Sequence, residues 1–579
     1  MKRCPQCNRV ETDKALKFCR IDGATLVSES PSLGGEAGTA QLGSDANEVH
    51  TSILPHRTDA NINRATAATT VLPPQAAPSA TSELTKPGRR KPIFIASAAI
   101  AVFAAAMIIG GYFYFSRKSS TAIQSIAVLP LENRSGTTDT DYLSDGLADS
   151  LIYRLSQLPN LKVSPTSSVM RYKGKSTDIA QIAKELQVDA VMSGRLMQQG
   201  DNLSISVQLI DARTNKLIWA EQYERKMSDL LATQREIAAS IAQKLQLKLA
   251  GDEKGITKKY TNSNEAYQSY LRGRFYWNKR NADALKKSIE YFNQAIEQDP
   301  GFALAYAGLA DSYNVLPYYS AASPEQSIPK AKAAARKALE IDDSLAEAHT
   351  ALAYTLVVYD WNFAESSKEF QRAIELNPNY ATAHQWYGDR LLVCLGRIDE
   401  GIAEVKRAAQ LDPLSLIINA DLGEVYLHAL QDDQAIEQLR RTIEMDPNFY
   451  NAHWRLGKAY EKKGSVQDAL AEYQKARQLN DDPLVLASLG HLLGSSGKQD
   501  QAMKTLDQLQ QMRKERYVSA YSFAIVYEGL GDKEKAFEWL ERGYQDRVFE
   551  MNYLKVDPLL EGLRSDPRFV DLVGRVGLP

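Results

Sequence analysis

Cysteine and net charge are both scarce in this chain of 579 residues. Its four cysteines are too few to form a disulfide scaffold at that length. The 69 basic and 71 acidic residues nearly cancel to a formal net charge of -2, which excludes a broadly basic nucleic-acid binder. With 44% hydrophobic and 24% charged residues, the chain has the composition of globular and not of disordered protein. A chain this long is predicted to fold as several domains.

Signatures of catalysis are missing as well. The sequence has no glycine-rich phosphate-binding loop, no His-Glu-x-x-His pair, no nucleophile elbow and no kinase signature. Asp145 and Asp149 stand one helical turn apart and could pair as acid and base, but carboxylates at this spacing beside a loop are more often solvated. We therefore expect that the protein is not an enzyme and has no small-molecule substrate.

One long apolar run stands out, because residues 93–115 carry no charge. A helix of 23 residues is about 34 Å long, enough to cross about 30 Å of hydrocarbon. Basic residues flank the run on both sides, and four aromatic residues end it, as at a membrane–water interface. We predict a single transmembrane helix over residues 92–116, with a buried core helix as the alternative.

Residues 27–91, which precede this run, are rich in Ser, Thr, Ala, Gly and Pro and have no sustained apolar period. Such a stretch cannot bury enough apolar surface to fold, so we predict a disordered linker. Basic residues on the two sides of the predicted span nearly balance and barely decide its orientation. The cysteine chemistry described next favours an amino terminus in the cytoplasm.

Three of the four cysteines crowd into the amino terminus, at Cys4, Cys7 and Cys19. The first two form a Cys-x-x-Cys pair, and Asp22 follows Cys19 at the position where a fourth cysteine would be usual. Two such turns can hold one tetrahedral zinc ion, and a carboxylate is an allowed zinc ligand. About 25 residues have no core without a metal, so we predict a structural zinc site at Cys4, Cys7, Cys19 and Asp22.

Other interpretations of this cluster stay open. A water could replace Asp22 as the fourth ligand, or the site could hold no metal, while a redox-active pair would need a βαβ unit that the stretch is too short to supply. The residues CPQCNRVETDKALKFCRIDGATL resemble the short zinc ribbons that open many bacterial membrane proteins. The resemblance covers residues 4–26 and implies a zinc ribbon over residues 1–26.

Strands and helices alternate after the predicted span. The apolar pattern predicts strands at residues 126–131, 161–169 and 188–196, a hairpin of residues 203–209 and 217–223, and helices at residues 142–158, 177–186 and 228–250. Their order predicts one compact α/β domain. The segments SIAVLPLENRSGTTDTDYLSDGLADSLIYRLSQLPNLKV and LSISVQLIDARTNKLIWAEQYERK resemble the TolB amino-terminal-like domain of bacterial envelope proteins. The resemblance is drawn over residues 121–252 and implies a binding or sensing module.

A motif built on small residues recurs through the rest of the chain. Its spacings are 35, 34, 33 and 34 residues between Gly388, Gly423, Gly457, Gly490 and Ala524. A small residue in one helix lets the next helix approach closely, and a proline after the second helix forces a turn into the next pair. The pattern resembles the tetratricopeptide repeat family and implies an all-α solenoid of about eight repeats over residues 264–544, capped by residues 545–579.

Such a solenoid presents the first helix of each pair on a concave face, where an extended peptide or a helix of a protein partner can lie. The candidate contact residues are Tyr354, Gln385, Asp389, Glu424, Trp454, Lys458 and Lys462. An exposed Trp454 would be a natural anchor for a partner. The alternative is that these residues only solvate the groove.

Three histidines, His349, His384 and His453, occupy corresponding positions in three repeats. Successive helix pairs are offset by ~10 Å, whereas zinc ligands lie ~2 Å from the metal. We therefore interpret these histidines as packing residues and not as a metal site.

These features together predict a non-enzymatic, single-pass membrane protein, a scaffold or sensor that binds protein partners through its solenoid and its TolB-like domain. Zinc is its expected cofactor. The expected localisation is the bacterial inner membrane, with the amino terminus in the cytoplasm and the later domains periplasmic or otherwise extracytoplasmic. The alternative is a membrane-tethered signalling or transcription regulator whose zinc ribbon contacts nucleic acid or cytoplasmic machinery.

Overall fold

The computed structural model of the chain divides into two compact units, Met1–Ala96 and Ser97–Pro579. It describes residues 123–135, 140–158, 160–175, 178–245 and 258–579, together with three short strands of the first unit. These strands form an antiparallel sheet in the order β2-β1-β3, where β1 is Lys2–Arg3, β2 is Val10–Glu11 and β3 is Val27–Ser28. Val27–Ser28, expected at the start of the linker, therefore pairs with the first strand of the chain.

Several predicted features lie outside the described residues. They are the zinc ligands Cys4, Cys7, Cys19 and Asp22, the linker beyond residue 28 and the transmembrane helix over residues 92–116. Within the described ranges, no helix combines the length and the apolar character needed to cross a membrane. The span over residues 92–116 is not in those ranges and stays a prediction.

A mixed sheet of six strands opens the described part of the second unit. Strands β4 (Ser125–Val128), β6 (Lys162–Val163) and β7 (Ala190–Gln199) are parallel, and β7, β8 (Asn202–Asp211) and β9 (Lys216–Lys226) form an antiparallel meander. The order is β6-β4-β7-β8-β9, and β5 (Glu132–Asn133) pairs with β7. The predicted hairpin is present in β8 and β9, where Asn202 faces Lys226 and Asp211 faces Lys216.

Helices α2 (Asp141–Ser156), α4 (Ile179–Leu186) and α5 (Leu230–Lys244) form where the apolar periods predicted helices, and the 3-10 turn η3 (Met227–Asp229) leads into α5. The strand predicted over residues 161–169 is wrong in its second half. There the chain forms helix α3 (Thr166–Val169) and the 3-10 turn η2 (Met170–Tyr172). Pro165 ends the strand because it has no amide hydrogen for the ladder, and its φ of -64° suits the start of a helix.

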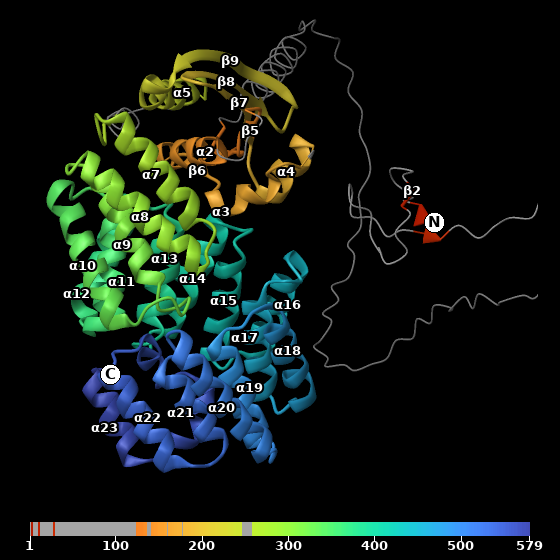
Figure 1. Cartoon of the computed structure of the whole chain (residues 1–579), viewed down its shortest axis with the longest axis vertical. Helices are drawn as coiled ribbons and strands as arrows, with labels where there is room; N and C mark the ends of the chain where they lie inside the picture. The colour runs from red at the N-terminus through yellow and green to blue at the C-terminus, as the bar shows by residue number, and fades with distance from the viewer. Residues whose placement is uncertain are drawn as a thin grey trace, which may run out of the picture. The chain divides into compact units, whose positions relative to one another are not determined.

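Helix pairs stack side by side through the rest of the unit (Figure 1). The first helices of eight pairs are α7 (Asn264–Trp277), α9 (Ala303–Val315), α11 (Ala346–Thr355), α13 (Ala381–Trp386), α15 (Leu416–His428), α17 (Tyr450–Lys462), α19 (Pro483–Ser495) and α21 (Ala520–Gly529). The second helices are α8 (Ala282–Gln298), α10 (Pro324–Ile341), α12 (Phe363–Leu376), α14 (Ile398–Leu411), α16 (Asp432–Met445), α18 (Val466–Leu479), α20 (Gln499–Glu515) and α22 (Lys533–Gln545). The recurring small residues lie at the contact of each pair: a Cβ on Gly457 would come within 2.6 Å of the Tyr473 ring.

Two of the first helices continue into a π turn. Helix α11 runs into η4 (Leu356–Asp360), and α13 runs into η5 (Tyr387–Leu392). A π turn accommodates one extra residue in a helix. The two 35-residue steps of the motif, from Ala353 to Gly388 and from Gly388 to Gly423, are the steps that contain these turns.

The sheet domain and the first repeats share one continuous apolar core. Helix α2 crosses α7 so closely that a Cβ on Gly146 would lie 2.9 Å from the Leu271 Cβ. Beside this crossing, the Tyr267 hydroxyl donates a 2.7 Å hydrogen bond to Ser150. Farther along the solenoid, the hydroxyls of Ser167 and Ser168 in α3 donate to Asp412, which ends α14.

Asp145 and Asp149 are buried, which corrects the expectation that they are solvated. Asp149 pairs with Arg274 of α7 at 2.9 Å, and Asp145 pairs with Lys173 at 2.8 Å. The sequence of α2 alone does not reveal this burial, because α7 and the turn after η2 supply the partners. The two carboxylates therefore join elements of the fold.

No ninth pair follows α22 among the described residues. Arg547 adopts a left-handed φ of 53°, and two 3-10 turns follow, η6 (Phe549–Tyr553) and η7 (Pro558–Leu563), before helix α23 (Pro567–Val576). Helix α23 packs on α22, as a cap does, and Arg575 pairs with Glu541 at 2.6 Å. Residues 547–564, which we call the return segment, turn back along the first helices, so that blue carboxy-terminal turns lie beside green repeats in Figure 1.

Candidate functional site

Charged side chains and one histidine of three neighbouring repeats gather on the face that the first helices form. Helices η5, α15 and α17 supply them, and all are at least nine-tenths buried. We call this group the inner-face cluster; it consists of Asp389, Arg390, Asp421, Glu424, His428, Arg455 and Lys458.

Arg455 lies at the centre of the inner-face cluster. Its guanidinium pairs with Asp421 at 2.6 Å and with Glu424 at 2.8 Å, and Arg455 is only 1% exposed. Gln385 of α13 donates to the other oxygen of Asp421 at 2.6 Å. Because these charges are desolvated, each depends on its partners for stability in the folded state.

The return segment completes the ion pairs and hydrogen bonds of the inner-face cluster. Lys458 lies 3.3 Å from Glu424 and 3.3 Å from Asp557 of the return segment. Arg390 donates a 2.6 Å hydrogen bond to the Tyr553 hydroxyl. The groove of the solenoid is therefore filled by the chain itself, and the solenoid's charges face groups of the return segment.

A small cavity of about 40 Å³ remains between the inner-face cluster and the return segment. Aromatic residues of distant repeats line it, among them Tyr318, Trp454 and Tyr521. The return segment contributes Glu550 to the same cavity. No donor among the described residues lies within hydrogen-bond distance of either carboxylate oxygen of Glu550, although the side chain is buried, and Ser519 offsets only part of that burial.

Burial shifts the protonation of several of these groups. It raises the pKa of Glu550 to about 7, and it raises the pKa of Asp389 to about 7 despite the nearby Arg390. Burial would also raise the pKa of Asp557, but Lys458 brings that pKa below its ordinary value. Burial lowers the pKa of His428 to about 4, so this histidine is neutral at pH 7.

Two family models match parts of this architecture. A model described as the second domain of HilA/YgeH-like transcriptional regulators matches residues 121–240, and a tetratricopeptide repeat model matches residues 420–483. The helix pairs are tetratricopeptide repeats. The TolB-like character expected of the sheet domain stays a prediction.

Curated relatives resemble part of the chain. A Rhizobium meliloti protein named "Putative adenylate cyclase 3" is 32% identical over 235 residues, 40% of either chain. The transcriptional regulator HilA of Salmonella typhimurium is 24% identical over 223 residues, 38% of either chain. The chain therefore matches about two fifths of the length of these relatives. A solved structure of pilF from Pseudomonas aeruginosa is 24% identical, with a TM-score of 0.29, over 37% of this chain and 92% of that one.

The residues predicted to line the tetratricopeptide groove do lie in its first helices, but most of them are buried. Trp454 is 8% exposed and donates through its indole nitrogen to Ser488 at 2.9 Å, so the expectation of an exposed anchor is wrong. Tyr354 packs on Trp386 with ring centroids 4.6 Å apart. Lys462 pairs with Asp432 at 2.6 Å. Contact of a partner with these three residues, or with Gln385, Asp389, Glu424 and Lys458, stays a prediction.

Sequence reasoning missed several groove residues, of which Arg390 and Arg455 are the clearest. Arg390 follows a predicted contact residue, Asp389, but η5 changes the helical register there, so spacing within an ordinary helix does not place both on one face. Arg455 directly follows Trp454, and side chains of consecutive helical residues point about 100° apart, so the position of Trp454 in the groove does not by itself place Arg455 there. An arginine inside the repeat motif is the one signal that could have drawn attention to it, since arginine is rarely buried without partners.

The three corresponding histidines have the packing role that their spacing predicted. Each Nδ1 contacts a glutamate of the following second helix at 2.5–2.6 Å, and each Nε2 contacts a main-chain carbonyl of the preceding turn at 2.9–3.1 Å. The pairs are His349 with Glu369, His384 with Glu404 and His453 with Glu472. No group of three or more His, Cys, Asp or Glu side chains that could hold a metal occurs in the described part of the chain.

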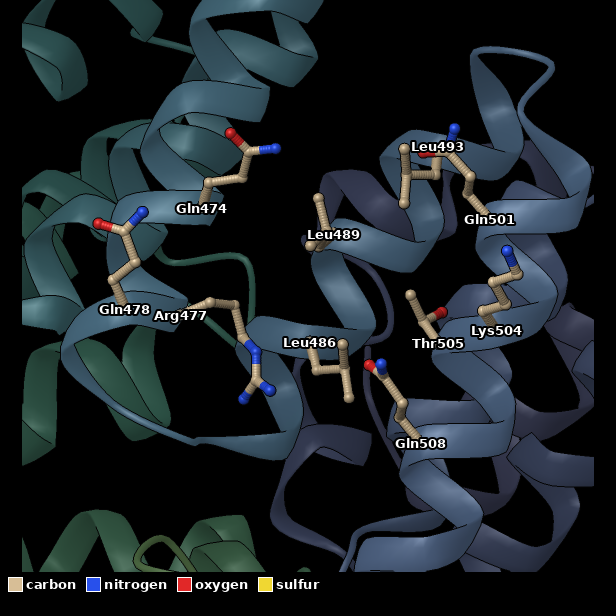
Figure 2. Close-up of a pocket in the computed structure, with 10 residues that line it drawn as sticks. All are labelled: Gln474, Arg477, Gln478, Leu486, Leu489, Leu493, Gln501, Lys504, Thr505 and Gln508. Carbon is tan, nitrogen blue, oxygen red and sulfur yellow. The ribbon is translucent and has the colours of Figure 1, made fainter.

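A second hollow of about 450 Å³ opens on another face, between α18, α19 and α20. Figure 2 shows its floor, made of Leu486, Leu489 and Leu493 of α19, with glutamines on either side. None of the ten described residues that line this outer pocket is acidic. The polar residues of its rim are Gln474, Arg477, Gln478, Gln501, Lys504 and Gln508, of which all but Arg477 are exposed.

Proposed function

We propose that the protein is a non-enzymatic scaffold whose tetratricopeptide groove binds an extended segment of a protein partner. The return segment is the observation that carries this proposal, since it lies along the first helices of distant repeats through side-chain anchors. Arg390 and Lys458 present charged donors at the two ends of the inner-face cluster, and charged donors give strong, directional hydrogen bonds. A groove that holds one extended segment in this way can hold another.

The amino-terminal region would anchor this scaffold. Three thiolates and a carboxylate, from Cys4, Cys7, Cys19 and Asp22, are donors that zinc accepts. The paired strands β1 and β2, which flank Cys4 and Cys7 in the sequence, support a ribbon. Zinc content of the full chain tests this part: we expect one ion per chain, lost in Cys19→Ser and held more weakly in Asp22→Asn than in Asp13→Asn.

The localisation that we propose is the bacterial inner membrane, with residues 92–116 crossing once and the amino terminus in the cytoplasm. The sheet domain and the repeats would then lie outside the cytoplasm, as a sensor or scaffold of the envelope. Reporter fusions at residues 30 and 400 test this orientation. Activity of a cytoplasmic reporter at residue 400 would contradict it.

A second candidate is a membrane-tethered signalling or transcription regulator. The match of residues 121–240 to the second domain of HilA/YgeH-like regulators favours it. In that case the zinc ribbon would contact nucleic acid or cytoplasmic machinery. Salt-dependent binding of DNA or RNA by the full chain, lost in Cys19→Ser, would support this candidate over the first.

Site-specific photo-crosslinking tests binding in the groove. A benzoylphenylalanine at position 318 replaces Tyr318, which lines the inner cavity, and the same group at position 503 replaces Met503, an exposed residue of α20. We expect protein adducts from position 318 in the full chain in its native cells and few from position 503. Equal yields from the two positions would contradict binding in the groove.

A further inference from the structure

The return segment lies between two helices that also contact each other directly. Helix α22 precedes it and α23 follows it, and these two helices pair directly through Arg575 and Glu541 at 2.6 Å and Arg568 and Glu534 at 2.9 Å. These ion pairs hold α23 on the last repeat independently of the polar contacts that the return segment makes in the groove.

Two contacts of the return segment use main-chain carbonyls of η4. Arg547 donates to the Tyr359 carbonyl at 3.2 Å, and the Asn552 amide donates to the Val357 carbonyl at 3.1 Å. A π turn takes carbonyls out of the regular α-helical register, which lets them accept from outside the helix. The groove thus offers acceptors at one end that any segment with suitable donors can use.

Two side-chain anchors follow, four residues apart. The Tyr553 hydroxyl accepts from Arg390 at 2.6 Å and lies 3.4 Å from Asp389. The Asp557 carboxylate lies 3.3 Å from Lys458 and accepts from the Tyr521 hydroxyl at 2.9 Å. These anchors contact repeats four, six and eight, so the segment spans the groove.

The fit of the return segment is incomplete at Glu550. This side chain is 5% exposed, no donor among the described residues lies within hydrogen-bond distance of its carboxylate oxygens, and the nearby Ser519 side chain offsets only part of the burial. Burial raises its pKa to about 7, so the docked segment keeps an incompletely compensated acid in the groove at neutral pH. A segment with the same anchors and no acid at this position would fit the groove better.

We propose that the return segment is a ligand of the groove in cis, and that the partner is a protein segment with the same anchors: Asn-Tyr, three residues, then Asp-Pro. This proposal rests on the function proposed above. The partner displaces the return segment, so its apparent affinity is lowered by the fraction of chains whose groove is occupied. The return segment thereby raises the concentration of partner that is needed to fill the groove.

Titration of the full chain with a labelled peptide tests this competition. The probe is a peptide of residues 547–564 carrying Glu550→Gln, followed by fluorescence anisotropy with the chain in detergent. In the chain, Asp557→Asn weakens the return segment and leaves the groove intact, and asparagine can still cap η7. We expect this chain to bind the peptide about ten-fold more tightly than the natural chain, as loss of a charged hydrogen bond implies.

Matched variants separate the groove from the loop. Adding Lys458→Met to the Asp557→Asn chain removes a groove donor and should weaken peptide binding about ten-fold. Tyr553→Phe in the chain removes one hydroxyl, is a milder change for folding, and should strengthen peptide binding in the same direction as Asp557→Asn. A scrambled peptide of the same composition should not bind.

Equal affinity of the natural and the Asp557→Asn chains for the peptide would overturn the cis assignment. So would exchange of the return segment between two copies, seen as a dimer in sedimentation. If no chain binds the peptide while position 318 still yields partner adducts, the anchors are wrong and the scaffold function stands. If position 318 yields no adducts either, the scaffold function itself fails.

Discussion

The inner groove and the outer pocket belong to one solenoid, yet they differ in charge and in what fills them. The groove holds the inner-face cluster, whose ions are buried and are completed by Tyr553 and Asp557 of the return segment. The outer pocket has a floor of leucines and a rim of exposed glutamines with Arg477 and Lys504, and no described segment fills it. Buried charges tie the stability of the groove to its occupant, whereas the outer pocket has no such dependence.

Removal of the central arginine of the groove should give the largest difference in stability between variants of the two sites. Arg455→Met leaves Asp421 and Glu424 buried without their main partner, and we expect a loss of about 3–5 kcal/mol in the free energy of unfolding. Urea denaturation followed by circular dichroism measures it. Arg477→Met in the outer pocket removes a more exposed pair with Asp481 and should cost about 1 kcal/mol or less. Similar losses in the two variants would refute the contrast.

The acid at the groove should make docking of the return segment depend on pH. Glu550 has its pKa raised from 4.5 to about 7, so its protonated form is favoured in the docked state. Docking is then strongest below pH 4.5 and weakens as the pH rises through 7. The groups that face Glu550 are Ser519, Asp482 and Asp557, together with the other residues that line the inner cavity.

Hydrogen exchange of the amides of η6 and η7 measures this effect. After correction for intrinsic rates, protection in the natural chain should fall between pH 5 and pH 8. Glu550→Gln should keep its protection at pH 8, with a gain of about 2–3 kcal/mol over the natural chain at that pH. Protection in α20 is the internal reference and should not change. A parallel pH dependence in both chains would contradict a role for Glu550.

The repeat motif predicted the solenoid well because each tetratricopeptide pair is stabilised by contacts that are local in sequence. Gly457 and Tyr473 are close in the chain and pack together, so their spacing carries the information. The 35-residue steps at Ala353 and Gly388 even mark the two π turns, although the meaning of the extra residue is visible only in the structure.

The contents of the groove could not be predicted in the same way. Asn552 contacts Val357 and Tyr553 contacts Arg390 across well over a hundred residues of chain, and no period connects them. The return segment has no apolar period of a regular helix, and the repeat pattern predicts it only as part of a cap. For the same reason Asp389, Lys458 and Trp454 were expected at an open surface, when they are covered by a segment from the far end of the solenoid.

Helix α19 lines both sites, and its residue His491 joins it to the first helices of the two neighbouring repeats. Its Nδ1 lies 2.6 Å from Glu461 of α17, and its Nε2 lies 2.6 Å from Glu528 of α21. Burial would lower the pKa of His491, but the two glutamates raise it to about 10. The stabilisation is therefore complete below pH 6.5 and is lost as the pH rises through 10.

Denaturation midpoints at several pH values check this prediction. We expect the natural chain to lose about 1–2 kcal/mol between pH 7 and pH 10 in excess of His491→Gln, in which the pH slope should be flatter. His349→Gln is the matched control, since His349 contacts one glutamate and lies in a distant repeat. A slope that survives in His491→Gln would assign the pH dependence to other groups.

The smallest effect is expected at the rim of the outer pocket. Gln508 is exposed on α20 and borders the hollow without taking part in its leucine floor, so Gln508→Ala should change the free energy of unfolding by no more than about 0.5 kcal/mol. Urea denaturation measures it beside Arg455→Met, and peptide titration should show unchanged affinity in the groove. A loss of several kcal/mol would mean that a bound segment covers the rim glutamines of the outer pocket. The outer pocket would then resemble the groove, because the stability of both sites would depend on the segment that occupies them.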